Sequence, residues 1–295
     1  MRSARISNKL VDISPTLNES NILDIPDTGE RNGNSNYSAR SLLRYPGGKT
    51  RGVDFITQFF PQRLDKLLSP FFGGGSIELA VAAKGTKVCG YDVFSPLVEF
   101  WQCLIAKPLE LAGEVEKYFP LPKHSFYELQ KTQTRFRTKL QRAAVYYVLN
   151  RSSFSGSTLS GGMSPDHPRF TETAIERLRN FYNPNVSVTK GDFKQSLANH
   201  PHTFTYLDPP YLIGSSLYGR KGDAHRGFDH EGLAEILKQR EHWILSYNDC
   251  EPIREMYEGF HILTPNWKYG MSNDKSSKEI LIFSKNFKIE GQPVY

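Results

Sequence analysis

The tetrapeptide Asp208-Pro209-Pro210-Tyr211 combines residue types that few chemistries require together. It follows the apolar run 203–207, whose β-branched and aromatic residues predict a short strand. The carboxylate is therefore expected at the carboxyl end of a strand, where open α/β sheets bind their ligands. Neither proline carries an N–H group, so the local backbone offers only hydrogen-bond acceptors. A carboxylate, free carbonyls and an aromatic ring suit a planar ligand with an amino group, such as a nucleobase; a plain turn is the alternative.

A glycine-rich turn lies upstream and indicates a nucleoside pocket. The apolar run 67–72 leads into the glycines 73–75, and residues 76–83 are good helix formers. Strand, glycine turn and helix in this order let the backbone approach a ligand closely and expose the N–H groups of the helix start. The turn lacks both the G-x-G-x-x-G spacing of dinucleotide sites and the phosphate-binding G-x-x-x-x-G-K-[ST] motif. A nucleoside without a pyrophosphate is therefore the better fit.

Two further segments could complete that pocket. The predicted strand 87–92 ends in Asp92, and an acid at this position accepts hydrogen bonds from ribose hydroxyls in nucleoside-binding domains. Asp92 could instead cap a helix predicted over 94–106. Upstream, Arg44-Tyr45-Pro46-Gly47-Gly48-Lys49 marks a tight loop with an aromatic residue and a cation. It is a candidate for closing the pocket from the far side, and a surface turn is the alternative.

The order of these motifs resembles the Dam-like class of adenine-specific DNA methyltransferases. In that class the glycine motif precedes a target-recognition region, and the catalytic tetrapeptide follows both. The motifs that carry the resemblance are, in chain order, R-Y-P-G-G-K, S-P-F-F-G-G-G-S, G-Y-D, G-D-F and D-P-P-Y. Tyr218 and the runs 228–233, 246–249 and 278–282 extend it, with a shorter gap before Asp229 than the family has. The resemblance covers about residues 41–285.

The resemblance implies a fold, a cofactor and a reaction. The implied fold is α/β, with a Rossmann-like methyltransferase sheet flanked by helices and a mainly helical target-recognition insert. S-adenosylmethionine is the implied cofactor, and the implied substrate is an adenine flipped out of double-stranded DNA. Two acceptors on the amine hydrogens favour a pyramidal nitrogen whose lone pair points at the methyl group. We therefore expect direct transfer without a covalent enzyme intermediate.

The resemblance also implies roles for individual residues. Asp208 and the carbonyl of Pro209 are expected to accept the amine hydrogens, and Tyr211, next to Pro210, to stack on the flipped base. Asp192 is expected to bond the edge of the cofactor adenine while the next residue packs on its ring. The residues expected to contact the cofactor are Tyr45, Lys49, Phe72, Gly73, Gly74, Gly75, Asp92, Asp192, Phe193 and Asp208.

The formal net charge of +6 is confined to one segment of the chain. Residues 121–184 hold ten Lys or Arg against four acidic residues, whereas the rest of the chain balances at 27 against 27. This segment lies between the glycine motif and Asp208, where an insert that binds nucleic acid would be needed. A solvated helix face is the alternative explanation of the charge.

Residues in and beyond this segment are the candidate DNA contacts. The pattern Asn150-Arg151-x-x-Phe154-x-Gly156 resembles the start of the recognition hairpin of the family. The downstream hairpin motif of GATC-specific members is not evident, so GATC is one candidate among several short target sequences. The residues expected to contact DNA are Lys139, Asn150, Arg151, Ser153, Phe154, Ser155 and Tyr218.

The chain divides into three predicted regions. Residues 1–40 are rich in Asn, Ser and Asp and are expected to form a flexible tail. Residues 41–120 and 185–295 are expected to form the catalytic domain, and residues 121–184 the recognition insert. The stretches 151–170 and 212–228 are predicted as long loops beside the DNA and the catalytic site. Other helices are predicted over 55–60, 124–136, 138–149, 171–182 and 231–241, and other strands over 186–188, 243–248, 260–263 and 279–284.

Composition limits the class of protein. No apolar run approaches the ~20 residues of a membrane span. The three cysteines form no C-x-x-C pair, and no histidine pairs with them at zinc spacing. We therefore expect no metal and a reducing compartment, which is the cytoplasm or, if the chain is viral, the host compartment that holds the DNA. We further expect a monomer or weak dimer, with any cognate restriction endonuclease acting as a separate protein.

Three other functions share part of this pattern. An RNA adenine methyltransferase would use the same chemistry, and a catalytically silent DNA-binding relative would keep the fold. Protein-amide methyltransferases resemble N-P-P-Y, with Asn where this chain has Asp208, so they fit less well.

Overall fold

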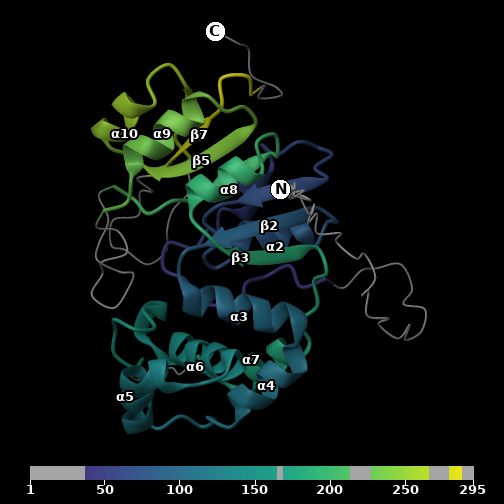
Figure 1. Cartoon of the computed structure of the whole chain (residues 1–295), viewed down its shortest axis with the longest axis vertical. Coiled ribbons are helices and arrows are strands. Elements are labelled where there is room, and N and C mark those ends of the chain that lie inside the picture. Colours follow the sequence, from purple (N-terminus) through teal and green to yellow (C-terminus); the bar gives the residue numbers. More distant parts are fainter. Residues whose placement is uncertain (1–36, 165–168, 213–226, 266–278, 288–295) are drawn as a thin grey trace, which may run out of the picture. The chain divides into compact units, whose positions relative to one another are not determined.

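A central sheet organises the fold in the computed structural model, which describes residues 37–164, 169–212, 227–265 and 279–287 (Figure 1). Within the unit that spans residues 36–295, the described strands form a seven-stranded sheet in the order β3-β2-β1-β4-β5-β7-β6. The strands are β1 (Lys66–Ser69), β2 (Lys87–Asp92), β3 (Val186–Lys190), β4 (Thr205–Leu207), β5 (Trp243–Asn248), β6 (His261–Leu263) and β7 (Glu279–Phe283).

Most of the sheet is parallel. Strands β3, β2, β1, β4 and β5 run in one direction, whereas β7 is antiparallel to both of its neighbours, β5 and β6. Every residue of β5 and β7 is buried, which explains why both strands have near-continuous apolar sequences. The predicted α/β class, with a Rossmann-like sheet flanked by helices, is confirmed.

The strand order changes direction between β1 and β4. These strands are neighbours, with Leu68 opposite Thr205, although the predicted insert separates them in the chain. In open α/β sheets, ligands bind in the crevice outside the carboxyl ends of the strands at such a switch point. The glycine turn 73–75 follows β1 and Asp208 follows β4, so the topology brings both motifs to one crevice.

Helices cover both faces of the sheet (Figure 1). Helices α1 to α7 share a core cluster with Leu67 of β1, while α8, α9 and α10 share another with Leu68. Successive strand residues point to opposite faces, which is why these two neighbours join different clusters. The helices are α1 (Val53–Thr57), α2 (Ser76–Ala82), α3 (Ser95–Ala106), α4 (Pro108–Glu116), α5 (Lys123–Thr132), α6 (Lys139–Ser152), α7 (Glu172–Arg179), α8 (Phe193–Asn199), α9 (His230–Lys238) and α10 (Glu251–Met256), with 3-10 turns η1 (Gln133–Arg135) and η2 (Phe154–Gly156).

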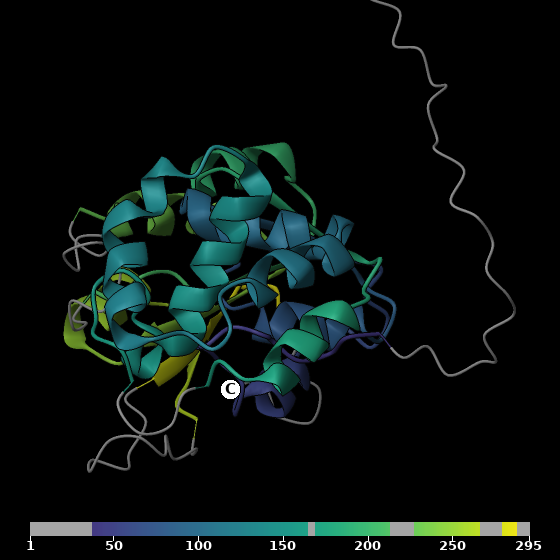
Figure 2. The ribbon, with the colours of Figure 1, turned by 90° about the horizontal axis from the view of Figure 1, so that it is seen from below.

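The segment 121–184 contributes α5, α6 and α7 (Figures 1 and 2). Helix α6 contacts α3 and α4, α7 contacts α4, and α5 packs on α6. Helix α6 begins with a capping box, in which the Thr138 hydroxyl accepts from the Gln141 N–H at 3.2 Å and the Gln141 side chain accepts from the Thr138 N–H. It continues through Ser152, beyond the predicted end at 149, so the predicted loop 151–170 begins later than expected. The division of the chain into catalytic and recognition parts stays a prediction.

The predicted tail 1–40 lies outside the described residues up to position 36. From there the backbone is tied to the end of the segment 121–184. The N–H of Ser38 donates to the carbonyl of Tyr182 at 2.8 Å, and the Asn183 amide donates to the carbonyl of Ser38 at 3.1 Å. The described chain therefore starts in contact with the residues that lead into β3.

Candidate active site

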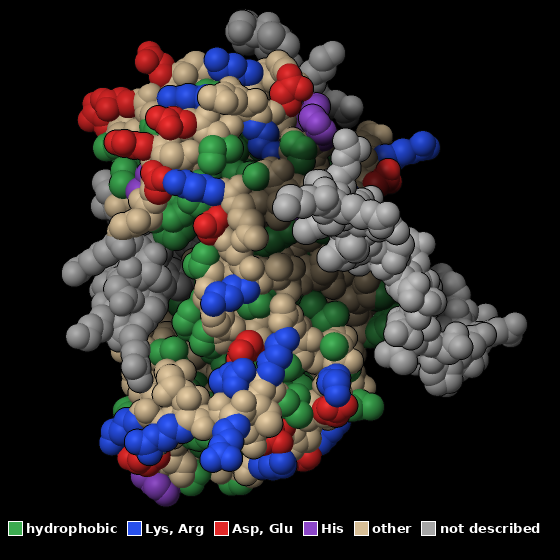
Figure 3. Space-filling view, in the orientation of Figure 1, with side chains coloured by type: hydrophobic (Ala, Val, Ile, Leu, Met, Phe, Trp, Pro, Cys, Tyr) green, Lys and Arg blue, Asp and Glu red, His purple; other side chains and the backbone are tan. Residues whose placement is uncertain are grey.

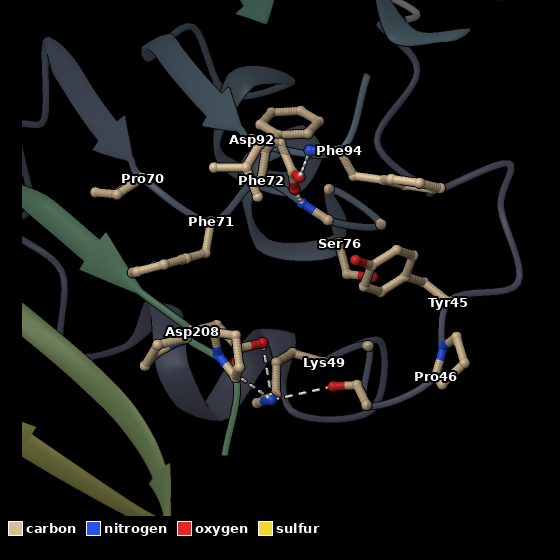
Figure 4. A pocket seen from close by; sticks show the side chains of 18 of the residues that line it. Tyr45, Pro46, Lys49, Pro70, Phe71, Phe72, Ser76, Asp92, Phe94 and Asp208 are labelled. Atoms are coloured by element: carbon tan, nitrogen blue, oxygen red, sulfur yellow. Dashed lines mark hydrogen bonds and ion pairs between the residues drawn. The ribbon is translucent and has the colours of Figure 1, made fainter. Parts of the chain in front are cut away.

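Asp208 lies directly after β4, at the position that the sequence predicts. All three residues of β4 are buried between β1 and β5, so the strand end is a fixed platform. Both oxygens of Asp208 accept hydrogen bonds from Nζ of Lys49, at 2.8 and 2.9 Å (Figure 4). Lys49 is 3% exposed and also donates to the carbonyl of Gly47 at 3.0 Å. The lysine of the upstream loop and Asp208, the predicted catalytic residue, therefore form one ion pair.

The ion pair sets the charge of both groups. Burial disfavours the Lys49 charge, but Asp208, Tyr211 and Glu279 hold the pKa of Lys49 well above its ordinary value. Burial raises the pKa of Asp208 from 3.8 to about 6, while Lys49 acts in the opposite direction. At neutral pH Asp208 is therefore a carboxylate. A carboxylate offers about four acceptor positions, so Lys49 leaves room for a ligand amine.

Tyr211 is fixed by residues from neighbouring strands. Its hydroxyl donates to Oε1 of Glu279 at 2.6 Å, and the next N–H, of Leu212, donates to Oδ1 of Asn248 at 3.2 Å. Glu279 also lies 3.6 Å from Nζ of Lys49. The sequence analysis missed Glu279. The signal that could have found it is an acidic residue at the start of a buried strand, where an unpaired charge is rare.

Tyr45 covers the glycine turn and explains why three glycines are needed there. A Cβ on Gly73 would lie 2.9 Å from the Tyr45 ring, and one on Gly74 would lie 2.6 Å from the Tyr45 Cβ. Gly73 and Gly75 have φ values of 48° and 67°, in the left-handed region that favours glycine. The Trp101 indole N–H donates to the carbonyl of Gly73 at 3.0 Å. The turn is thus held between two aromatic side chains.

Asp92 ends β2 and binds the backbone of two loops. Its Oδ2 accepts from the Gly73 N–H at 3.0 Å and its Oδ1 from the Phe94 N–H at 2.9 Å. Burial raises the pKa of Asp92, and the hydrogen bonds from Phe94 and Gly73 act in the opposite direction. Phe72 is buried beside it and fills the space that a side chain at Gly90 would need. Asp92 therefore holds the loops together whether or not it also binds ribose.

Asp192 caps α8, a helix that the sequence analysis missed. Its Oδ1 accepts from the Gln195 N–H at 2.8 Å. Phe193, the first residue of α8, is 7% exposed, and its ring centroid lies 6.0 Å from that of Phe71 and 5.3 Å from that of Phe228. The helix start thus presents an acid and an aromatic face side by side.

One cavity of about 580 Å³ joins these groups. Figure 4 shows Asp92 and Asp208 on opposite sides of it, with Tyr45 and Lys49 reaching in from the upstream loop. All ten residues predicted to contact the cofactor line this cavity, as do Pro209, Pro210 and Tyr211. Bare glycine backbone, carboxylates at both ends and aromatic walls fit a nucleoside that carries a positive charge. The structure therefore brings the predicted residues together.

Glu78, which lines the cavity, is a second acid that the sequence analysis missed. It lies in α2, is 3% exposed, and accepts a hydrogen bond from the Ser69 hydroxyl at 2.7 Å. Burial raises the pKa of Glu78 to about 7, and the Ser69 hydrogen bond acts in the opposite direction. A lone acid among the apolar residues of the predicted helix 76–83 was the available signal.

Comparison with known proteins identifies the family. Residues 45–271 match the family model of the D12 class of N6 adenine-specific DNA methyltransferases. The chain belongs to this family. It is 22% identical over 246 residues to the type II methyltransferase M1.LlaDCHI of Lactococcus lactis subsp. cremoris, covering 76% of this chain and 86% of that relative. It is 21% identical over 231 residues to the type II methyltransferase M.CviBI of Paramecium bursaria Chlorella virus NC1A, covering 75% and 87%.

The D12-class assignment confirms the predicted enzyme class, an adenine-specific DNA methyltransferase. A third relative, the type II methyltransferase M.FokI of Planomicrobium okeanokoites, is 25% identical over 221 residues, covering 68% of this chain but 33% of that relative. The match to the D12 model begins at Tyr45 and includes every cavity residue that the sequence analysis named.

Two predicted DNA contacts of this D12-class enzyme are internal. Asn150 and Ser153 are both 0% exposed. The Asn150 amide pairs with the backbone N–H and carbonyl of Arg44, each at 2.8 Å, and the Ser153 hydroxyl accepts from the Thr158 N–H at 2.9 Å. Their polar atoms are thus committed to the loops that border the cavity. Both side chains therefore hold these loops, and their contact with DNA stays a prediction.

Other predicted DNA contacts of the enzyme are accessible. Phe154 is 63% exposed, and Ser155 beside it has a φ of 52° that turns the chain sharply. Lys139 is exposed and donates to the side chain of Gln102. Arg151 is half-buried in the last turn of α6. Tyr218 lies outside the described residues. Contact of these side chains with DNA stays a prediction.

Within the described part of the enzyme, no three His, Cys, Asp or Glu side chains are grouped so that they could hold a metal ion. Likewise, none of the described helices has the length and apolar character needed to span a membrane.

Proposed function

We propose that the chain transfers a methyl group from S-adenosylmethionine to the exocyclic amine of a flipped adenine within a short duplex DNA sequence. We further propose that it belongs to the Dam-like class within its family. The observation that carries the proposal is the Asp208 carboxylate at the end of β4, kept ionised by Lys49, in one cavity with the glycine turn. The family assignment supplies the base and the polymer.

The cofactor would be held by groups that already line the cavity. The glycine turn under Tyr45 allows a close approach of backbone, Asp92 offers remaining acceptor positions to ribose, and Phe193 offers a face to adenine. S-adenosylmethionine supplies a methyl group that the positive charge of its sulfonium activates.

The residues after β4 would orient the target amine. Asp208 and the carbonyl of Pro209 accept its two hydrogens, which aims the nitrogen lone pair toward the methyl group. The Asp208 charge stabilises the positive charge that develops on this nitrogen. Tyr211 stacks on the flipped base, and this contact offsets roughly 1–3 kcal/mol of the cost of unstacking the base from the duplex. No side chain needs to form a bond to the substrate, so the acceleration comes from alignment and electrostatics.

The first prediction concerns pH. Because burial raises the pKa of Asp208 to about 6, kcat/KM should fall as the pH drops through that value, by about tenfold per unit below it. An unperturbed aspartate would lose activity only near pH 4. A pH–rate profile measures this, with a melting curve at each pH to exclude unfolding. A limb near pH 4 in the wild type would contradict the assignment.

The DNA side of the proposal is supported by charge. Figure 3 shows Lys and Arg side chains gathering over the helical, lower part of the face in view. An arginine cluster (Arg44, Arg151, Arg169 and Arg177) is centred on Arg151, and its member Arg44 borders the loop 154–159. Arg44 donates to the carbonyl of Ser153 at 2.8 Å, and Arg151 to that of Arg169 at 3.0 Å. Burial, together with Arg177, Arg44 and Arg169, lowers the pKa of Arg151.

This arginine cluster lacks compensating acids among the described residues, where none of its members forms an ion pair with a carboxylate. Like charges held together in this way favour an anion such as a DNA phosphate. Phe154, exposed next to the cluster, would then insert beside the flipped base. We propose that Arg44 and Arg151 border the bound duplex, with Arg169 and Arg177 on its backbone.

The second prediction follows from this arrangement. Arg169→Gln and Arg177→Gln should each weaken DNA binding alike for all sequences, and each should reduce the slope of log K against log salt by about 0.9. Arg179→Gln is the matched control, because Arg179 lies on the same helix but is already paired with Glu116 and Glu176. Titrations at several salt concentrations measure the slopes. Equal slopes for all three variants and the wild type would rule the phosphate contacts out.

Substrate competition tests the proposed function itself. Labelled methyl groups should enter a duplex DNA probe and be recovered as N6-methyladenine. An excess of a second, unmethylated DNA should lower the incorporation of label into the probe, whereas RNA of the same sequence should not. Competition by RNA alone would favour the RNA methyltransferase alternative. Cofactor binding without transfer to either would favour a silent DNA-binding relative.

The relatives are named as type II methyltransferases, so we also propose a role in restriction–modification, with the endonuclease as a separate chain.

A further inference from the structure

We propose that Glu279 is a positioning residue, which sets the orientation of the Tyr211 ring and shares Lys49 with Asp208. The inference rests on the proposed function, because the Tyr211 ring matters only if a base stacks on it. It assigns a role to Glu279, to which the sequence analysis gave none.

The position of Glu279 in the sheet places its side chain against the catalytic loop. It is the first residue of β7, lies opposite Asn248 at the end of β5, and is 8% exposed. A charge buried to this degree needs hydrogen bonds and an opposite charge. Glu279 has both, since Oε1 accepts from the Tyr211 hydroxyl at 2.6 Å and lies 3.6 Å from Nζ of Lys49.

Tyr211 depends on this contact for its orientation. It follows two prolines, and neither can donate a backbone hydrogen bond. Its ring lies beside Tyr247, with centroids 6.0 Å apart and an interplanar angle of 31°, and Nζ of Lys49 is 5.2 Å from its centroid. Burial raises the pKa of Tyr211 well above its ordinary value, so the hydroxyl stays protonated. It therefore donates a charge-assisted hydrogen bond, the kind that best fixes geometry.

A second contact comes from the same strand pair. Asn248 accepts from the N–H of Leu212, one residue after the tyrosine. The paired ends of β5 and β7 thus hold the Tyr211 side chain through Glu279 and the following backbone through Asn248. Aromatic stacking requires a defined ring plane, and this double attachment supplies it before the base arrives.

Glu279 also acts on Asp208 through charge. Burial is the largest cause of the raised pKa of Asp208, and the Glu279 carboxylate adds to it while Lys49 opposes it. Among the described residues, the charged or titratable groups around this centre include Lys49, Asp208, Tyr211, Tyr206 and Glu78. Removing the Glu279 charge should therefore lower the pKa of Asp208 and move the acidic limb of kcat/KM to lower pH.

The test uses the full chain and a duplex with 2-aminopurine in place of the adenine that the wild type methylates. Glu279→Ala should lower kcat at least about tenfold, the range expected for losing one base–aromatic stack. It should brighten the 2-aminopurine, because an unstacked base is less quenched, and leave the S-adenosylmethionine Kd within about threefold. Glu279→Gln keeps an acceptor for Tyr211, so it should restore stacking and most of kcat while shifting the acidic limb. Glu258→Ala, at an exposed glutamate, is the control.

Wild-type kcat and fluorescence in Glu279→Ala would overturn the inference while leaving the proposed function standing. An unshifted acidic limb in Glu279→Gln, which is isosteric, would also overturn it even if the alanine variant failed to fold. Failure of the wild type to methylate DNA adenine would instead remove the proposed function, and this inference with it.

Discussion

Replacing Asp208 with alanine is expected to reduce methyl transfer at least about 10²–10³-fold, the loss typical when one electrostatic stabiliser is removed from an active site. Asp208 supplies one of two acceptors for the target amine, and its charge stabilises the developing positive nitrogen. Removing one partner of the buried ion pair should cost stability, but the fold should survive, because Lys49 keeps the opposite charge of Glu279 at 3.6 Å. Burial also raises the pKa of Asp208, which means that its charged form is itself destabilised in the fold. Removing this carboxylate therefore relieves a desolvation cost. Initial rates and a thermal melt measure both effects.

Asp208→Asn is the matched variant for this prediction. It keeps a side-chain oxygen of nearly the same shape but loses the charge, and its NH₂ group would face Lys49, a donor that already occupies both oxygens. We expect it to be almost as inactive as the alanine variant, with S-adenosylmethionine bound at close to wild-type affinity. Near-normal turnover in either variant would contradict the assignment of Asp208 as the acceptor of the amine.

Replacing Lys49 with methionine is expected to destabilise the protein by about 3–5 kcal/mol, the cost of removing one partner of a buried ion pair. Lys49 is 3% exposed and Asp208 23% exposed, so water compensates the remaining carboxylate only in part. Lys49 lowers the pKa of Asp208, so its removal should raise that pKa above 6. Activity should therefore fall at least about tenfold at pH 6 and recover partly at pH 9. Chemical denaturation and a pH–rate profile measure the two effects.

Lys107→Met is the control for the Lys49→Met variant. Lys107 pairs with Glu110 at 3.1 Å, but both side chains are more than half exposed. Exposed pairs at this helical spacing contribute only about 0.3–0.5 kcal/mol. The stability and the pH profile of the control should therefore match the wild type. Equal stability of Lys49→Met and Lys107→Met would show that the buried ion pair does not support the site.

The strands that position the site could be predicted from local sequence. The runs 87–92 and 243–248 match β2 and β5 residue for residue. Both lie inside a sheet covered on two faces, so their apolar sequences are bounded clearly by polar residues. The motifs at the strand ends followed from this, because an acid or a glycine turn directly after a parallel strand belongs to the ligand edge of the sheet.

The contacts that hold the site together could not be predicted in this way. Lys49 and Asp208 are 159 positions apart, and Asn150 lies 106 positions from its partner Arg44. Such pairs leave no periodic pattern in the sequence. Asn150 therefore looked like a surface residue at a loop start, whereas its amide is the internal link between two loops. Short helices such as α8 were missed because seven residues give too little periodicity.

The most direct test of the central claim is transfer of labelled methyl groups from S-adenosylmethionine to unmethylated duplex DNA, with wild type and Asp208→Ala side by side. The products are digested to nucleosides, and the modified sites are mapped. We expect N6-methyladenine confined to one short sequence with the wild type, and at least about 10²-fold less of it with the variant. Label on another base, or equal label with both proteins, would contradict it.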